Sequence, residues 1–215
     1  MNKKIKVHLL VNEVAGNGNA VAADHSLQKV LNNLNIPFSH KKSNYPGELI
    51  KLAEDYANKN PNPNDILIVV GGDGSFNEVL NGIKRSNFPE TPITYLPAGT
   101  GNDFARGAGL TNDPLQLVNN LLQDPEPERV DCGFFTSNIA KMPHGYFVNN
   151  FGIGFDAFVV HESNNEKLKQ KLNHVNFGNL IYGLNIIKAL AKQNTFTVTI
   201  KTANETVRYG DAYFV

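Results

Sequence analysis

Two glycine-rich segments carry side chains that could bind and transfer a phosphate group. The first is Gly71-Gly-Asp-Gly-Ser-Phe-Asn-Glu78, and the second is Pro97-Ala-Gly-Thr-Gly-Asn-Asp-Phe-Ala-Arg106. Glycine permits close approach of the backbone, and backbone N–H groups at a helix start can bind phosphate oxygens. An acid such as Asp73 beside a phosphate indicates a bridging Mg²⁺ or an ordered hydroxyl group. Each segment alone also fits a simple capped turn, but the two together favour a phosphate site.

The second segment adds three polar groups beside its glycines. Thr100 offers a hydroxyl, Asn102 an amide and Asp103 a carboxylate, and Arg106 follows one helical turn later, where it could pair with Asp103. An earlier Gly/Asn loop, residues 12–18, lacks the third glycine of a dinucleotide-binding fingerprint. The chain contains no Gly-Lys dipeptide, which excludes a Walker P-loop.

The elements around these segments alternate between strand and helix. Such alternation predicts a doubly wound parallel sheet, with its ligand at the carboxyl ends of the strands, where the glycine loops lie. The expected strands are Ile5–Val11, Phe38–Lys42, Asp65–Val70 and Thr91–Leu96, and the expected helices are Val21–Leu34, Pro46 to about Lys59, Asn77–Ile83 and one starting at Phe104.

The composition of the chain changes at a polar, proline-containing connector, Gln123–Arg129. We expect a domain boundary near residue 129, which separates an α/β domain (1–129) from a mostly antiparallel β-rich domain (130–215). Expected strands there are Val130–Phe135, Tyr146–Phe151, Thr195–Thr202 and Glu205–Val215, with one helical stretch over Asn165–Lys192. Because the chain ends on an apolar strand whose edge would need cover, we expect this second domain to be truncated.

Composition narrows the classes of function. The 215 residues include 20 basic and 20 acidic side chains, so the chain lacks the positive field of a nucleic-acid binder. One cysteine, Cys132, excludes an internal disulfide framework and a cysteine zinc cluster. No apolar run reaches the ~18 residues that span a bilayer. His161-Glu162 does not continue into a zinc-binding His-Glu-x-x-His motif, because residue 165 is Asn.

At these residues the chain resembles the diacylglycerol kinase catalytic domain, and more closely the soluble bacterial lipid kinases, which share the fold of sphingosine kinases. The order and spacing of Gly71–Glu78 and Leu96–Arg106 carry the resemblance, which extends to Phe151–Ala157 and Phe177–Tyr182 and covers essentially the whole chain. It implies an α/β fold class: a doubly wound parallel-sheet nucleotide-binding domain followed by a mostly antiparallel β-sandwich domain, incomplete in this chain.

The resemblance also implies roles for individual residues. Asp73 and Asp103 would help to organise Mg·ATP and the reacting centre, and no residue is assigned as a direct metal ligand. Glu13 departs from the proline that the family usually has there. The family's general base and a further Mg²⁺ site lie in a later segment, which would begin after Val215. The implied nucleotide-binding residues are Asn12, Gly16, Ser43, Gly72, Asp73, Gly74, Ser75, Asn77, Glu78 and Thr100.

The implied activity is an ATP- and Mg²⁺-dependent lipid kinase of phospholipid biosynthesis, which phosphorylates a lipid hydroxyl, with diacylglycerol converted to phosphatidic acid. ATP and a lipid at a membrane surface are the expected partners, a homodimer is left open, and the expected location is cytoplasmic or peripheral at the membrane. Two alternatives remain: another kinase with this glycine loop, such as an NAD kinase, or a nucleotide- or lipid-binding protein without the base. The apolar stripe of residues 165–192 could face lipid, although packing against the β region is favoured.

Overall fold

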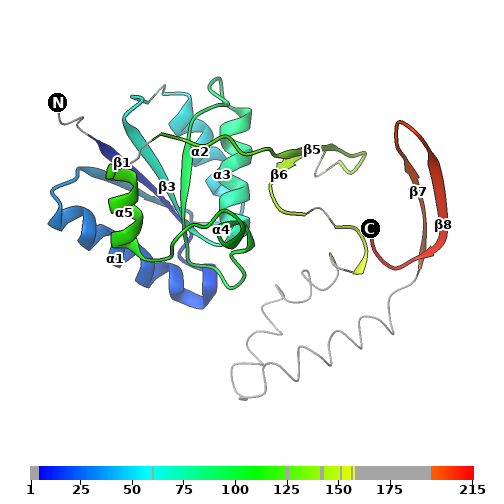
Figure 1. Ribbon diagram of the computed structural model, residues 1–215, viewed down its shortest axis with the longest axis horizontal. Helices are drawn as coiled ribbons and strands as arrows, with labels where there is room; N and C mark the ends of the chain where they lie inside the picture. The colour runs from blue at the N-terminus through cyan, green and yellow to red at the C-terminus, as the bar shows by residue number, and fades with distance from the viewer. Residues whose placement is uncertain are drawn as a thin grey trace, which may run out of the picture. The chain divides into compact units, whose positions relative to one another are not determined.

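The computed structural model describes residues 5–59, 61–123, 126–140, 143–150, 152–155, 157 and 195–215. The chain divides into two compact units, residues 1–149 and 150–215 (Figure 1). This division lies later in the chain than the domain boundary expected near residue 129, which stays a prediction. Each unit is described by itself below.

A four-stranded parallel sheet forms the centre of the first unit. Its order is β2-β1-β3-β4, with β1 at Lys6–Val11, β2 at Phe38–Lys42, β3 at Asp65–Gly71 and β4 at Ile93–Pro97. The apolar run of β3 is buried on both faces, as expected for an inner parallel strand, and Leu67–Val70 are at most 1% exposed. Because β2 and β3 lie on opposite sides of β1, the strand order reverses between β1 and β3. Ligands of such sheets bind in the crevice outside the carboxyl ends of the strands, at the point where the strand order reverses.

Helices cover both faces of this sheet (Figure 1). On one face, α1 (Asn19–Asn33) and α5 (Pro114–Gln123) pack against Ile68 and Val70. On the other, α2 (Glu48–Ala57), α3 (Asp73–Arg85) and α4 (Asp103–Gly107) pack against Leu67 and Val69. The alternation of neighbouring side chains between the two cores follows from the two-residue period of a strand. The predicted doubly wound α/β fold is confirmed.

Two details of the helices differ from the sequence-based prediction. Helix α3 begins at Asp73, not at Asn77, so Asp73, Gly74 and Ser75 belong to its first turn instead of to the preceding loop. Helix α5 was not predicted at all. Its start has a recognisable signal, because the Asp113 carboxylate accepts hydrogen bonds from the backbone N–H groups of Leu115 and Gln116, as an N-cap does.

The later strands form antiparallel pairs. In the first unit β5 (Gly133–Thr136) pairs with β6 (His144–Phe147), and in the second β7 (Phe196–Lys201) pairs with β8 (Thr206–Ala212). The predicted antiparallel character is therefore confirmed, while the packing of these strands into a sandwich stays a prediction. The helix expected over residues 165–192, like the Phe177–Tyr182 motif, lies outside the described residues.

Candidate functional site

Three loops meet at the carboxyl edge of the parallel sheet. They follow β1, β3 and β4, and backbone hydrogen bonds join them in sequence. The N–H group of Asn12 donates to the carbonyl of Val70 at 3.0 Å, and that of Ala98 donates to the carbonyl of Gly71 at 2.6 Å. The glycine segments singled out in the sequence are thus brought together at the strand-order reversal between β1 and β3, where a ligand is expected.

Glycine is required at two of the points where these loops touch. Gly16 has a φ of +61°, and a Cβ atom there would lie 2.1 Å from the carbonyl oxygen of Ala98. A Cβ atom on Gly99 would lie 2.5 Å from the Cα atom of Gly72. A side chain at Gly16 or Gly99 would therefore push the loops apart. Close backbone packing of this kind leaves main-chain N–H groups at the edge, where phosphate oxygens can use them.

Asp73 ties the second loop to the third. Its carboxylate accepts hydrogen bonds from the backbone N–H groups of Asp103 at 2.9 Å and Phe104 at 3.1 Å. It therefore caps the start of α4, whose own N-cap residue, Asn102, makes no side-chain cap to that helix. Beneath this cap the ring of Phe104 stacks on Phe76 of α3, with ring centroids 4.5 Å apart. The sequence suggested an Asp that caps the helix of its own segment, whereas Asp73 of the second loop caps α4, the helix that follows the third loop.

The third loop is held by Asn102, which has a φ of +57°. Its Oδ1 atom accepts hydrogen bonds from the Gly99 N–H group at 2.9 Å and from the Tyr95 hydroxyl at 3.0 Å. Burial, aided by the nearby negative charge of Asp73, raises the pKa of Tyr95, which keeps this hydroxyl a donor. Thr100 is exposed at the tip of this loop. Its hydroxyl is therefore open to a ligand.

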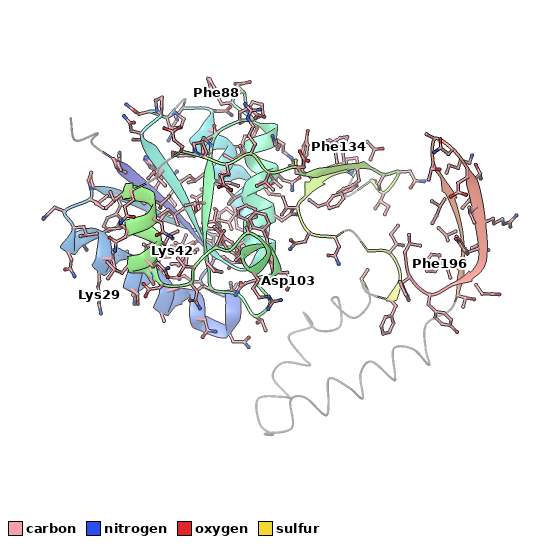
Figure 2. All side chains as sticks on the ribbon, in the orientation of Figure 1. Lys29, Lys42, Phe88, Asp103, Phe134 and Phe196 are labelled. Carbon is pink, nitrogen blue, oxygen red and sulfur yellow. The ribbon has the colours of Figure 1, made fainter. Side chains whose placement is uncertain are left out.

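Asp103 lies at the start of α4, where Figure 2 labels it. Its exposed carboxylate pairs with the guanidinium of Arg106, which confirms the predicted ion pair. Gly101 lies between the two acids: a Cβ atom there would be 3.5 Å from Asp73 Oδ2 and 3.9 Å from Asp103 Oδ2. The two predicted catalytic carboxylates therefore lie on either side of one glycine.

The remaining predicted residues of α3 differ in their surroundings. Ser75 is 3% exposed, and its hydroxyl oxygen accepts a hydrogen bond from the Asn12 amide at 3.0 Å. Gly74 is exposed and has open space around it. Asn77 is half-buried, and its Oδ1 atom is shielded from solvent and has no hydrogen-bond partner among the described residues. Ser75 and Asn12 thus fasten the first loop to α3, while Gly74 faces solvent.

Ser43 and Glu78 lie on the side of the site formed by β2 and α2. The N–H group of Ser43 donates to the Val11 carbonyl at 2.9 Å, which holds the end of β2 against β1. Glu78 accepts a hydrogen bond from the Gly47 N–H group at 3.1 Å. Burial raises the pKa of Glu78, and backbone hydrogen bonds from Gly47 and Leu49 oppose that rise.

Glu13, the departure from the family pattern, forms an ion pair with Lys42 of β2 at 2.9 Å. Its carboxylate is thereby engaged by a cation instead of remaining unpaired beside a phosphate site. Lys42 is exposed on the edge strand of the sheet (Figure 2).

Sequence reasoning missed Asn81, which lies one helical turn after Asn77. Its buried side chain donates to the carbonyls of Asn77 at 2.8 Å and Tyr146 at 2.9 Å, and accepts from the Tyr146 N–H group at 2.9 Å. The amide therefore pairs with β6 as a neighbouring strand would, and fixes the β5–β6 pair on α3. A polar residue on the apolar face of a predicted helix was the available signal.

The charge at this edge is mixed. Helices α3 and α4 both begin there, and their N-termini carry partial positive charge, while Asp73 and Asp103 contribute negative charge. Among the described residues no three His, Cys, Asp or Glu side chains form a metal-binding group. The arrangement can hold phosphate oxygens and supplies two carboxylates beside them, but no complete metal cage.

Within the part of the chain that the structure describes, no helix is long and apolar enough to cross a membrane.

Comparison with protein families and curated proteins gives a consistent result. The diacylglycerol kinase catalytic domain matches residues 6–134. A Bacillus subtilis protein named "Putative lipid kinase YtlR" is 29% identical over 205 residues, which make up 95% of this chain and 66% of the relative. A Staphylococcus carnosus protein named "Putative lipid kinase" is 28% identical over 92% of this chain and 60% of its own length.

Solved structures agree with the sequence relatives. One, described as a "putative diacylglycerol kinase" from Bacillus anthracis, matches with a TM-score of 0.66 at 26% identity and covers 97% of this chain. The chain covers 64% of that protein. It thus spans less than two thirds of the length of the relatives and the structure named here.

Proposed function

Because the chain belongs to the diacylglycerol kinase catalytic domain family, we propose that it transfers the γ-phosphoryl group of Mg·ATP to a lipid hydroxyl, with diacylglycerol as the acceptor. The relatives are named as lipid kinases, which supports a kinase acting on lipid. The phosphoryl donor, the metal and the identity of the lipid are our proposals.

One observation carries the proposal. The loops after β1, β3 and β4 are joined through bare backbone at the reversal of strand order, where Gly16 meets Ala98 and Gly72 meets Gly99. Glycine is needed at these contacts only if the loops must stay close to each other, because a Cβ atom there would push them apart. A polyphosphate bound across them has that requirement, because its oxygens need donors from several loops at once.

The residues present fit the phosphates of a nucleotide. The start of α3, at Gly72 and Asp73, and the exposed hydroxyl of Thr100 would hold the phosphates. Asn12 and Ser43, at the ends of β1 and β2, would approach the nucleoside. These residues orient the triphosphate and exclude bulky groups from it. Phosphoryl transfer depends mainly on such positioning and on neutralised charge, which suits a site of this composition.

Mg²⁺ fits the same edge in the manner usual for that ion. It commonly binds one or two carboxylates, with water and substrate phosphates completing its shell. Asp73 and Asp103 flank Gly101 and would hold it, directly or through water. When bound, the ion would neutralise charge on the phosphates. Asp73 also orients α4 through two backbone hydrogen bonds, which would help to bring Asp103 and Thr100 to the same phosphates.

In the proposed reaction the lipid oxygen forms a bond to the γ-phosphorus while the bond to the bridging oxygen of ADP breaks. The proton of the lipid hydroxyl passes to a carboxylate base. We assign that base to none of the residues that the structure describes. Since diacylglycerol resides in membranes, we further propose that the protein works at the cytoplasmic membrane surface.

The test is transfer of radiolabel from [γ-³²P]ATP in the full natural protein. Diacylglycerol in mixed micelles, NAD and fructose 6-phosphate are supplied as separate acceptors, each with Mg²⁺ and with EDTA. We expect labelled phosphatidic acid that requires Mg²⁺. Label in NAD or in the sugar phosphate instead would overturn the lipid assignment in favour of another kinase. Calorimetric binding of ATP with no transfer to any acceptor would favour a nucleotide sensor.

A further inference from the structure

We propose that Glu78 is a positioning residue: it fixes the start of α2, and thereby the loop that carries Ser43, without contacting the nucleotide. The inference rests on the proposed function, in which Ser43 lies beside the nucleotide. It changes the role of Glu78, which the family resemblance placed among the residues that hold the phosphates.

The partners of Glu78 are backbone groups of another helix. Its carboxylate accepts a hydrogen bond from the Gly47 N–H group at 3.1 Å. Gly47 is the N-cap residue of α2, with a φ of +87°, and it has no side chain with which to cap the helix. A helix start with such a residue needs an acceptor from elsewhere. Glu78, thirty-one positions away, supplies it.

The acidic residue in the first turn of α2, Glu48, bonds to a different part of the loop. The carboxylate of Glu48 accepts hydrogen bonds from the backbone N–H and the side-chain amide of Asn44. Glu48 therefore orders the middle of the loop, while Glu78 orders its end at Gly47. At the beginning of the loop, the N–H group of Ser43 is bonded to Val11 of β1. Five residues are thus fixed at three points, only one of which comes from α3.

Contact between the two helices makes the position of Glu78 definite. One turn further along α3, a Cβ atom on Gly82 would lie 2.2 Å from the Ile50 carbonyl oxygen and 2.8 Å from the Ala53 Cβ atom. The backbones of α2 and α3 are therefore in direct contact. Glu78 projects from a helix that packs directly against α2, which brings its carboxylate within hydrogen-bond distance of the start of α2.

The chemistry of Glu78 favours this indirect role. An unpaired carboxylate would repel a triphosphate, whereas a carboxylate that accepts a backbone N–H group at a positive helix end has its charge partly balanced. Glu78 is half-buried, whereas Thr100, a proposed nucleotide contact, is exposed. Glu78 is therefore positioned to hold the loop of residues 43–47, and that loop in turn would contact the nucleotide.

The experiment is a double-mutant cycle on the binding of Mg·ATP, measured by calorimetry in the full natural protein. We expect Glu78→Ala to weaken binding about tenfold, and Ser43→Ala to weaken it in the parent but not in the Glu78→Ala background. Glu78→Gln keeps an acceptor oxygen and should retain binding within about threefold of the parent. The matched control cycle pairs Glu78→Ala with Thr100→Ala, which lies on a different loop and should be additive.

A second measurement separates failure of the inference from failure of the proposed function. Hydrogen exchange at the amides of Gly47 and Leu49, without nucleotide, should accelerate in Glu78→Ala and not in Asp55→Asn, an exposed change on α2. Unchanged exchange, or additive effects of the Glu78 and Ser43 substitutions, would overturn the positioning role. A parent protein that exchanges as expected but binds no nucleotide would overturn the proposed function instead.

Discussion

Asp73 has a structural role and a proposed role in phosphoryl transfer, and a series of substitutions can separate the two. Because it caps α4 with two hydrogen bonds, we expect Asp73→Ala to lower the free energy of unfolding by about 1–3 kcal/mol. Because we also propose that it helps to hold the phosphates of Mg·ATP, the same change should reduce phosphoryl transfer more than about a hundredfold. Asp73→Asn keeps one acceptor oxygen but turns an NH2 group toward the second N–H donor, so it should recover only part of the stability and none of the activity. Urea unfolding and the radiolabel assay measure the two effects.

The matched control for Asp73 is Asp113, which caps α5 in the same way but lies outside the site. Asp113→Ala should cost similar stability and leave the rate of transfer unchanged. Transfer that persists in Asp73→Ala at the parent rate would reject the assignment of the site.

His8 links stability to pH. Its ring contacts the Ser39 hydroxyl at 2.7 Å and Asp65 at 3.2 Å, and burial lowers its pKa below 6.5 even though Asp65 favours the charged form. A base with a lowered pKa binds fewer protons in the folded state, so stability is lost as pH falls below 6.5. We expect the free energy of unfolding of the parent to fall more steeply between pH 7 and 5 than that of His8→Gln.

The measurement for His8 is urea unfolding at a series of pH values, with pH 8 as the reference at which imidazole is neutral in both states. A constant difference between parent and His8→Gln across the series would contradict the prediction. The offset at pH 8 itself reports lost packing and hydrogen bonds, and does not bear on the pKa.

At the scale of the elements, α3 connects the parts of the candidate site to one another. Residues 73, 75, 78 and 81, spaced along this one helix, bond respectively to α4, the loop after β1, the start of α2 and β6. Through these bonds α3 holds each loop of the candidate site in position relative to the sheet. Its close contact with α2 at Gly82 is what keeps that arrangement in place.

A pair of glycine substitutions in α3 tests that contact. Gly82→Ala places a methyl group against the Ile50 carbonyl and should destabilise the protein by about 1–3 kcal/mol. Gly74→Ala, in the same helix but with open space around it, should stabilise by up to ~1 kcal/mol, because alanine favours helix. Urea unfolding measures both. Equal effects of the two substitutions would show that the α2–α3 contact is looser than described.

At the scale of the whole molecule, ligand and folding should be coupled. A nucleotide that bridges three loops of the folded unit cannot bind the unfolded chain in the same way, so Mg·ATP at a hundred times its dissociation constant should stabilise by about 2.7 kcal/mol. Thermal unfolding with and without Mg·ATP measures the gain, which EDTA should reduce. Equal melting temperatures under all three conditions would argue against a nucleotide site formed by folding.

The sequence by itself determined the strands of the parallel sheet and most of its helices, and it predicted the site at the carboxyl edge of that sheet. The apolar run of β3 and the glycines that follow it needed no tertiary information, because strand burial and turn chemistry are local properties. The start of α3 was placed four residues late, since Gly72 and Gly74 favour a loop reading over a helical one. Helix α5 was missed although Asp113-Pro114 and its apolar spacing indicate a helix start.

Only the tertiary structure decided what each polar side chain holds. The sequence places Asp73 and Glu78 within one short motif, yet one caps α4 and the other caps α2, and Asn81 pairs with a strand sixty-five positions away. Short motifs fix which groups are available as donors and acceptors. Which of them meet depends on how the sheet brings distant loops together, because a hydrogen bond requires its two atoms within about 3 Å and local sequence does not set that distance.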